Sequence, residues 1–262
     1  MDDIAALMLQ VDWGADEALA EAPVSRLRAD PVAPAVITPP AAEPARAGQA
    51  VSGTAADARA RAEALAAAAE TPEALLAALA AFDGCALRAT AANLVFSAGN
   101  PSAELMLIGE APGADDDRAG EPFAGPPGAL LDRMLASIGL DRTQALLTTL
   151  IPWRPPGGRP PTEAEIALCL PFTLRHIALR APRRVVLMGG LAAKVLLGRA
   201  RPRRGDWVTL AVPGLADGVP ALAMAHPATV AKSASQKRDA WADLRRLRRA
   251  LDADRAGMNT PL

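Results

Sequence analysis

Residues 105–113 read Leu-Met-Leu-Ile-Gly-Glu-Ala-Pro-Gly, and this segment is the most informative part of the sequence. An apolar run that breaks into a turn of small residues is typical of a buried strand in an α/β protein, where ligand sites lie at the carboxyl ends of the strands. Glu110 stands at this exit, three more carboxylates follow at 115–117, and Phe123 comes shortly after them. A carboxylate in this position can organise water or face a developing positive charge, and an aromatic ring can stack on a flat ligand.

The same alternation continues along the chain. Strands are predicted at 104–109, 145–150, 184–188 and 221–225, and helices at about 126–139, 163–180, 190–197 and 235–251. Strands that alternate with helices imply a parallel sheet covered on both faces. We therefore expect an α/β fold, a three-layer α/β/α sandwich with a central four-stranded parallel sheet.

The first 81 residues follow a different pattern. We predict a short N-terminal helix at 1–21, a Pro/Ala-rich disordered linker at 22–53 and a helical lead-in at 54–81, followed by the main domain at 82–255. Thr71 and Pro72 read as the N-cap and first turn of a helix that runs to about Phe82. The N-terminal tail is interpreted as a tether that binds an unknown protein, if it binds one.

Composition restricts the setting of the protein. The sequence contains no charge-free apolar run of about 18 residues, so we expect no membrane span. Its acidic start lacks the basic region of a signal peptide, and two cysteines make no disulfide framework, so we expect a reducing, cytoplasmic location. Residues 1–80 carry 12 acidic and 5 basic side chains, and the remainder carries 17 and 23. A basic body indicates an anionic partner such as nucleic acid, or a merely solvated basic surface.

Four predicted strand exits carry polar or special residues. They are Glu110, Thr149, the pair Gly189-Gly190, and His226. Because parallel strands end at one edge of a sheet, these residues should meet there. Each also has a structural explanation: Glu110 as a surface turn residue, the glycine pair as an aid to tight strand-to-helix packing, and His226 as the cap of a strand end. Of the two histidines, His226 is the functional candidate, since His176 lies within a helix as a surface or partly packed residue.

The order of several motifs resembles that of the family-four uracil-DNA glycosylases, a bacterial and archaeal family whose members often hold an iron–sulfur cluster. The matching segments are 109–113 with the acidic residues 115–117, then 122–125, 154–157, His226-Pro227, Lys237-Arg238, and Trp241-Ala-Asp243-Leu244. The match covers roughly residues 82–251 and leaves residues 1–80 outside it.

The resemblance implies a DNA-repair enzyme of base excision, which hydrolyses the N-glycosidic bond of uracil after the base is flipped out of the duplex. It implies catalytic roles for Glu110 and His226. It implies a base-binding set of Gly109, Ala111, Asp116, Phe123 and Thr149, and a DNA-binding set of Arg154, Arg159, Val230, Lys232, Lys237 and Arg238. Phe123 would stack on uracil, His226 would donate to its O2, and Val230 would be a small wedge that fills the gap left by the base.

Three departures from the family's pattern bear on function. One is the small wedge: the family usually has a bulky apolar residue after the His-Pro pair, and a weaker wedge favours single-stranded or already unpaired substrates. Thr149 stands where the family has an asparagine that both donates to and accepts from the base, and one hydroxyl cannot reproduce both contacts. Only Cys85 and Cys169 remain of four cluster cysteines, as remnants of the set, and Phe82 and Trp153 stand at the other two places. We expect no complete 4Fe-4S cluster and no other cofactor or metal.

Two alternatives to a uracil glycosylase stay open at this point. One is a catalytically silent DNA-binding module of the same fold. The other is a glycosylase for a different deaminated base, hypoxanthine or xanthine, because Thr149 changes the edge of the base that is read. In each case we expect a monomer whose partner is DNA, either single-stranded or uracil-containing, and no membrane association.

Overall fold

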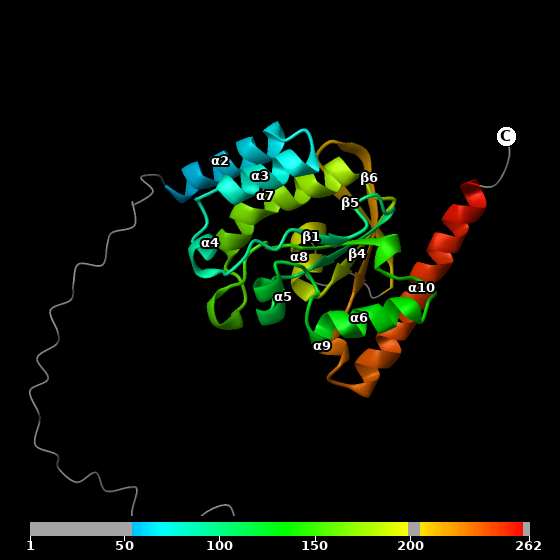
Figure 1. Ribbon diagram of the computed structural model, residues 1–262. Helices are drawn as coiled ribbons and strands as arrows, with labels where there is room; N and C mark the ends of the chain where they lie inside the picture. Colours follow the sequence, from blue (N-terminus) through cyan, green and yellow to red (C-terminus); the bar gives the residue numbers. More distant parts are fainter. Residues whose placement is uncertain (1–53, 199–204, 259–262) are drawn as a thin grey trace, which may run out of the picture. The chain divides into compact units, whose positions relative to one another are not determined.

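The computed structural model describes residues 54–198 and 205–258 (Figure 1). The predicted helix at 1–21 and linker at 22–53 lie outside the described residues. The strands are β1 (Ser97–Gly99), β2 (Leu105–Gly109), β3 (Ala145–Thr149), β4 (Arg184–Met188), β5 (Trp207–Val212) and β6 (Leu215–Met224). The α-helices are α2 (Ala55–Ala68), α3 (Pro72–Ala81), α4 (Leu87–Thr90), α5 (Ala114–Ala119), α6 (Pro126–Ala136), α7 (Glu163–Arg180), α8 (Gly190–Leu197), α9 (Pro227–Val230) and α10 (Ala234–Met258). Two short 3-10 helices are η1 (Arg142–Gln144) and η2 (Pro156–Gly158).

The sheet has six strands in the order β1-β3-β2-β4-β6-β5. Its four central strands, β3, β2, β4 and β6, are mutually parallel, and these are the four strands predicted from sequence. The prediction of a purely parallel, four-stranded sheet was wrong at both edges, where β1 pairs antiparallel with β3 and β5 pairs antiparallel with β6. The α/β fold class is confirmed, with a mixed sheet in place of a parallel one.

Alternation along β2 divides its side chains between the two faces of the sheet. Leu105 and Leu107 join a cluster with α6 and α10, which includes Leu131 and Leu244. Met106 and Ile108 point to the other face and join residues of α7 and α8. Helices therefore cover both faces, as expected for a three-layer sandwich, and the fully buried strand shows no polar alternation because neither face is solvated.

The lead-in helices pack on the main domain. Thr54 caps α2 through a capping box, and Thr71 caps α3, whose Pro72 occupies the first turn as predicted. Leu75 and Leu79 of α3 are buried in one cluster with residues of α7. Residues 54–81 thus share a hydrophobic core with the segment that follows them. No helix of the described part is long and apolar enough to cross a membrane.

His176 lies in the core rather than near the surface. Only 1% of it is exposed, its ring stacks on Phe96 with centroids 4.4 Å apart, and its Nε2 has no hydrogen-bond partner among the described residues. Burial, with a smaller contribution from the charge of Arg180, lowers the pKa of His176 to about 3. The ring is therefore neutral in the folded protein at any ordinary pH.

This buried ring should make stability fall with acidification. Below pH 6.5 the unfolded chain takes up a proton that folded His176 refuses, so the free energy of unfolding should drop by at most about 1.4 kcal/mol per pH unit until about pH 3. Urea unfolding of the wild type and of His176→Phe at pH 7.5, 6 and 5 measures this contribution. As pH falls, the free energy of unfolding of the wild type should decrease more than that of His176→Phe. An equal pH dependence of this free energy in both proteins would contradict the prediction.

Candidate functional site

The carboxyl ends of the central strands meet at one edge, as predicted. Gly109 of β2 lies opposite Thr149 of β3 in the parallel register, and Gly189 after β4 donates its N–H to the Met224 carbonyl of β6 at 2.8 Å. Residues that are far apart in the sequence are thereby brought to one edge of the sheet. Contacts made by Glu110 and Phe123 join the ends of β2, β4 and β6 into one site.

Glu110 is seated against the start of α8. Its Oε1 accepts a hydrogen bond from the backbone N–H of Leu191 at 2.7 Å, and the positive end of a helix dipole favours a carboxylate there. Gly189 has φ +114°, and a Cβ at this position would lie 2.4 Å from Glu110 Oε1. Gly189 is therefore needed to admit the Glu110 side chain, a role that the sequence did not reveal beyond the presence of a glycine pair at a strand exit.

His226 is held as a neutral hydrogen-bond donor. Its Nδ1 accepts from the backbone N–H of Ala228 at 3.3 Å, so the proton of the neutral ring is assigned to Nε2. Burial lowers the pKa of His226, and the charges of Glu110 and Asp116 partly oppose this. The result is a neutral imidazole whose Nε2–H is available to a ligand.

Phe123 lies directly against His226. The two rings are stacked, with centroids 5.7 Å apart and planes 23° from parallel, and Phe123 is 4% exposed. A Cβ on Gly109 would lie 2.9 Å from Phe123 Cζ, so the glycine leaves room for the ring. Phe123 has φ +57°, a left-handed conformation that is uncommon for a bulky residue and clusters at functional sites.

Asp116 braces the turn that carries Phe123. Its Oδ2 accepts from the N–H of Gly113 at 2.8 Å and its Oδ1 from the N–H of Ala124 at 2.7 Å. Both oxygens of the carboxylate therefore accept hydrogen bonds from backbone N–H groups. Ala111 is partly buried and packs on the core cluster that contains α3. The predicted contacts of Asp116 and Ala111 with a base stay predictions.

The hydroxyl of Thr149 is already engaged within the protein. It is 7% exposed, and its hydroxyl donates to the Ile151 carbonyl at 2.8 Å. Since a hydroxyl carries a single proton, only the lone pairs of its oxygen remain available. An N–H group of a base could donate to this oxygen, whereas a carbonyl of a base would find no donor in it.

The two arginines predicted to contact DNA differ in their surroundings. Arg159 makes a bidentate ion pair with Glu165, at 2.6 and 2.9 Å, and this pair lowers the pKa of Glu165 to about 2. Glu165 also completes the capping box of α7 with Thr162. In contrast, the buried Nε of Arg154 has no hydrogen-bond partner in the described part of the chain. Arg154 is thus the freer of the two for a ligand.

The segment after His226 presents cations but no wedge. Lys232, Lys237 and Arg238 are exposed around the start of α10, next to the short α9. Val230 is 3% exposed and packs in the same core cluster as Phe123. A wedge must leave the protein surface to enter a base stack. The burial of Val230 argues against that role in this conformation.

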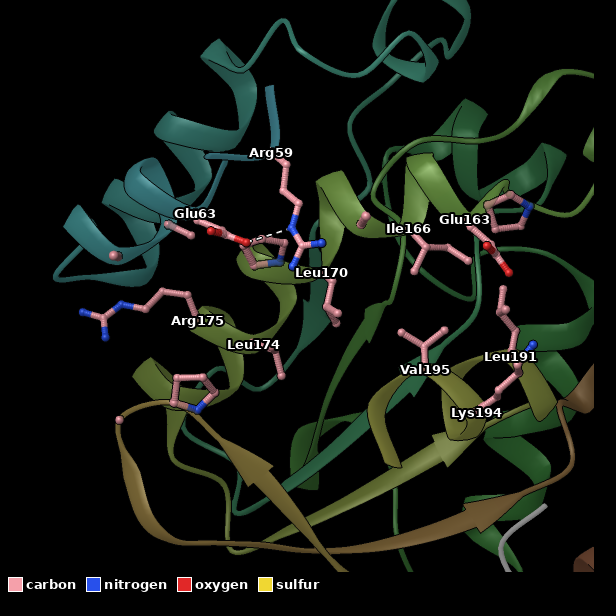
Figure 2. A pocket seen from close by; sticks show the side chains of 17 residues that line it. Arg59, Glu63, Glu163, Ile166, Leu170, Leu174, Arg175, Leu191, Lys194 and Val195 are labelled. Carbon is pink, nitrogen blue, oxygen red and sulfur yellow. Dashed lines mark hydrogen bonds and ion pairs between the residues drawn. The ribbon is translucent and has the colours of Figure 1, made fainter. Parts of the chain in front are cut away.

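A separate groove of about 820 Å³ is formed by residues of α2, α7 and α8 (Figure 2). Its floor is apolar, with Ile166, Leu170 and Val195, and the ion pair of Arg59 with Glu63, 2.9 Å long, lies at its rim. None of the predicted site residues lines it, and all of those residues are in the described part of the chain. This groove and the cluster of polar strand exits are therefore different places.

The fold and this cluster define an α/β protein with a carboxylate, a neutral histidine and an aromatic ring at the carboxyl edge of its sheet. The model of the "Uracil DNA glycosylase superfamily" matches residues 96–245. The chain belongs to this superfamily, and its predicted resemblance to the family-four, or type-4, members is confirmed by its relatives.

Three of these relatives carry the name type-4 uracil-DNA glycosylase. The protein of Pyrobaculum aerophilum is 37% identical over 127 residues, which cover 47% of this chain and 65% of the relative. That of Archaeoglobus fulgidus is 42% identical over 112 residues, covering 43% and 56%, and that of Thermotoga maritima is 32% identical over 131 residues, covering 47% and 68%. The chain thus matches between about half and two thirds of the length of these relatives.

The residues do not fit the iron–sulfur cluster that the resemblance implies. The sequence holds two cysteines, whereas such a cluster takes four thiolates. Cys85 and Cys169 are buried in one apolar cluster with Phe82 and Trp153, which are each 2% exposed. Contact with Cys85, together with burial, raises the pKa of Cys169 well above the usual range of a thiol. Among residues 54–198 and 205–258, no three His, Cys, Asp or Glu side chains form a group that could hold a metal ion.

Proposed function

We propose that this protein is a DNA-repair glycosylase that hydrolyses the N-glycosidic bond of uracil in DNA. The observation that carries the proposal is the neutral His226 ring, which is stacked on Phe123 and influenced by the charge of Glu110, at the edge of the sheet. Because a glycosylase must reach a base outside the stack, the target nucleotide is flipped into this site. Phe123 then supplies an aromatic face for the flipped ring.

In the proposed reaction, the bond between N1 of uracil and C1′ of the sugar breaks, and its electron pair leaves with the base. Nε2–H of His226 donates to the uracil oxygen on which negative charge grows, which is an electrostatic role of the oxyanion-hole type. The Glu110 carboxylate faces the cationic sugar and positions water. Water adds to C1′, its proton goes to the departing base or to solvent, and free uracil and an abasic site remain.

Thr149 supports a second candidate, a glycosylase for hypoxanthine or xanthine. Its hydroxyl proton is committed to Ile151, so the site has one donor fewer for a pyrimidine carbonyl than an asparagine would give. The presence of threonine at 149, where the family has asparagine, also supports a silent module that binds DNA without releasing a base. Both alternatives are separable from the main proposal by one assay.

The assay is base release from end-labelled oligonucleotides that carry a single uracil, hypoxanthine or xanthine, each in single- and double-stranded form. Alkali cleavage at the abasic site on uracil substrates, lost in Glu110→Ala, would support the uracil glycosylase. Faster release of a purine would move the assignment to that base. DNA binding without release from any substrate would leave a binding module.

We further propose DNA contacts through the cations around the site. The guanidinium of Arg154 and the exposed Lys232, Lys237 and Arg238 would bind phosphates and hold the register of the strand. Arg159, engaged with Glu165, would contribute less. The protein is proposed to act as a monomer in the reducing cytoplasm, with residues 1–21 and 22–53 as a helix and tether for a partner, ahead of a glycosylase-like domain at 82–255.

Replacing Arg154 should weaken DNA binding more than replacing Arg159. Arg154→Ala removes one phosphate contact, so the slope of log K against log salt should become shallower by about 1 on duplex DNA. Arg159→Ala should leave that slope unchanged, because the side chain is already paired. Fluorescence anisotropy with a labelled duplex at several salt concentrations measures both slopes. Equal losses in the two variants would contradict the distinction.

A further inference from the structure

The Phe123–Ala124 peptide group is held at both ends by side chains of opposite charge. Its carbonyl oxygen accepts from Nη2 of Arg142 at 2.7 Å, and its N–H donates to Oδ1 of Asp116 at 2.7 Å. These two hydrogen bonds fix the orientation of the Phe123–Ala124 peptide plane. Since Phe123 is in the left-handed region, where a non-glycine residue stays only when its surroundings hold it, this fixation bears directly on where the ring lies.

Arg142 is itself oriented by Asp132 of α6. Its Nε donates to Asp132 Oδ1 at 2.7 Å and its Nη2 to Oδ2 at 3.3 Å, so the planar guanidinium bridges α6 and the Phe123 carbonyl. The first turn of α6 makes room for this arrangement. A Cβ on Gly128 would lie 1.7 Å from the Phe123 oxygen, which no other residue type could tolerate without a shift of that peptide.

The Arg142–Asp132 pair is a poor candidate for a purely structural role. The two side chains are 31% and 46% exposed, and ion pairs with such exposure contribute little to stability. Yet the pair aims a charged donor at the backbone carbonyl of Phe123, whose ring stacks on His226. Its effect is therefore expected on the position of the ring rather than on the persistence of the fold.

We propose that Arg142, oriented by Asp132, is a positioning residue that holds Phe123 in its left-handed conformation so that the ring faces the flipped base. This inference rests on the proposed glycosylase function. Arg142 itself would touch neither base nor sugar. A displacement of the ring by about 1 Å is enough to cost up to about 100-fold in rate.

The test compares Arg142→Met with Arg142→Lys, and with Arg59→Met as a matched control that breaks an exposed ion pair on α2. Single-turnover excision from a uracil-containing strand should slow by about 10- to 100-fold in Arg142→Met, with the Kd for DNA and the urea midpoint unchanged. Arg142→Lys, which keeps one donor, should recover part of the rate, and Arg59→Met should behave as the wild type. In a Phe123→Ala background, Arg142→Met should have no further effect, because the residue acts through Phe123.

Hydrogen exchange at the Ala124 amide gives a readout that needs no activity. The exchange should accelerate in Arg142→Met while the core amides of β2 keep their protection. A wild-type rate and an unchanged Ala124 amide in Arg142→Met would overturn the inference, as would a rate loss that follows a lower urea midpoint. If the wild type releases no uracil, the proposed function fails. In that case hydrogen exchange at the Ala124 amide alone tests the positioning role of Arg142. Faster exchange in Arg142→Met than in the wild type supports this role, and an unchanged rate of exchange overturns it.

Discussion

Replacement of His226 with alanine is expected to reduce the rate of uracil release by about 10²- to 10³-fold, the usual loss when one donor to a developing oxyanion is removed. The ring lies at the site as a neutral donor, with Nδ1 occupied by the N–H of Ala228 and Nε2–H free for the base. Truncation removes this donor without disturbing a strand. Single-turnover kinetics on a uracil-containing oligonucleotide measure the effect.

Two further measurements make the His226 prediction specific. His226→Gln, which keeps an N–H donor, should recover part of the rate, and the Kd of the alanine variant for DNA should match that of the wild type. Because burial lowers the pKa of His226, the wild-type rate should stay constant as pH falls through 6.5 and decline only at lower pH, where the ring is protonated. A full rate in His226→Ala would remove the histidine from the mechanism.

Thr149→Asn is expected to raise kcat/KM for uracil by about tenfold or more, since a bidentate contact with a base is worth about 1–3 kcal/mol. The threonine hydroxyl donates to Ile151 and leaves only an acceptor, whereas an asparagine amide offers a donor and an acceptor together. Parallel assays on uracil, hypoxanthine and xanthine would show whether the gain is confined to uracil.

The control for this substitution is Thr149→Val, which keeps the shape of the side chain and removes its hydroxyl. It leaves the Ile151 carbonyl without its donor at a buried position, so the free energy of unfolding should fall by about 1–3 kcal/mol with no gain in excision. If Thr149→Asn were no faster than Thr149→Val, the asparagine amide would have no role at this strand exit.

The central strands could be predicted because their residues are apolar on both faces. Segments 105–108 and 185–188 are continuous apolar runs, each followed directly by a glycine, so composition alone marks them. The edge strands could not be predicted in this way. β1 has three residues, and the pairing partner of β5 in β6 includes Asp217, Gly218 and Pro220, which read as a loop. Such residues are tolerated in strands near an edge, where one side of the ladder is free.

The candidate site also contains features that could be predicted from the sequence and features that could not. Glu110, Thr149 and His226 could be placed together from sequence, because parallel strands fix where their ends lie. The seat of Glu110 on the N–H of Leu191 and the hold of Arg142 on Phe123 depend on how α8 and η1 meet the sheet, which no local pattern encodes. The burial of His176 and of Val230 was missed for the same reason, since it is set by what packs on α7 and α9.

The apolar cluster of Phe82, Cys85, Trp153 and Cys169 has a consequence for how the lead-in helices are attached. Phe82 directly follows α3, and its ring centroid lies 5.4 Å from that of Phe172 in α7. The attachment of α3 to α7 therefore depends on the burial of apolar side chains, and it forms together with the hydrophobic core as the chain folds.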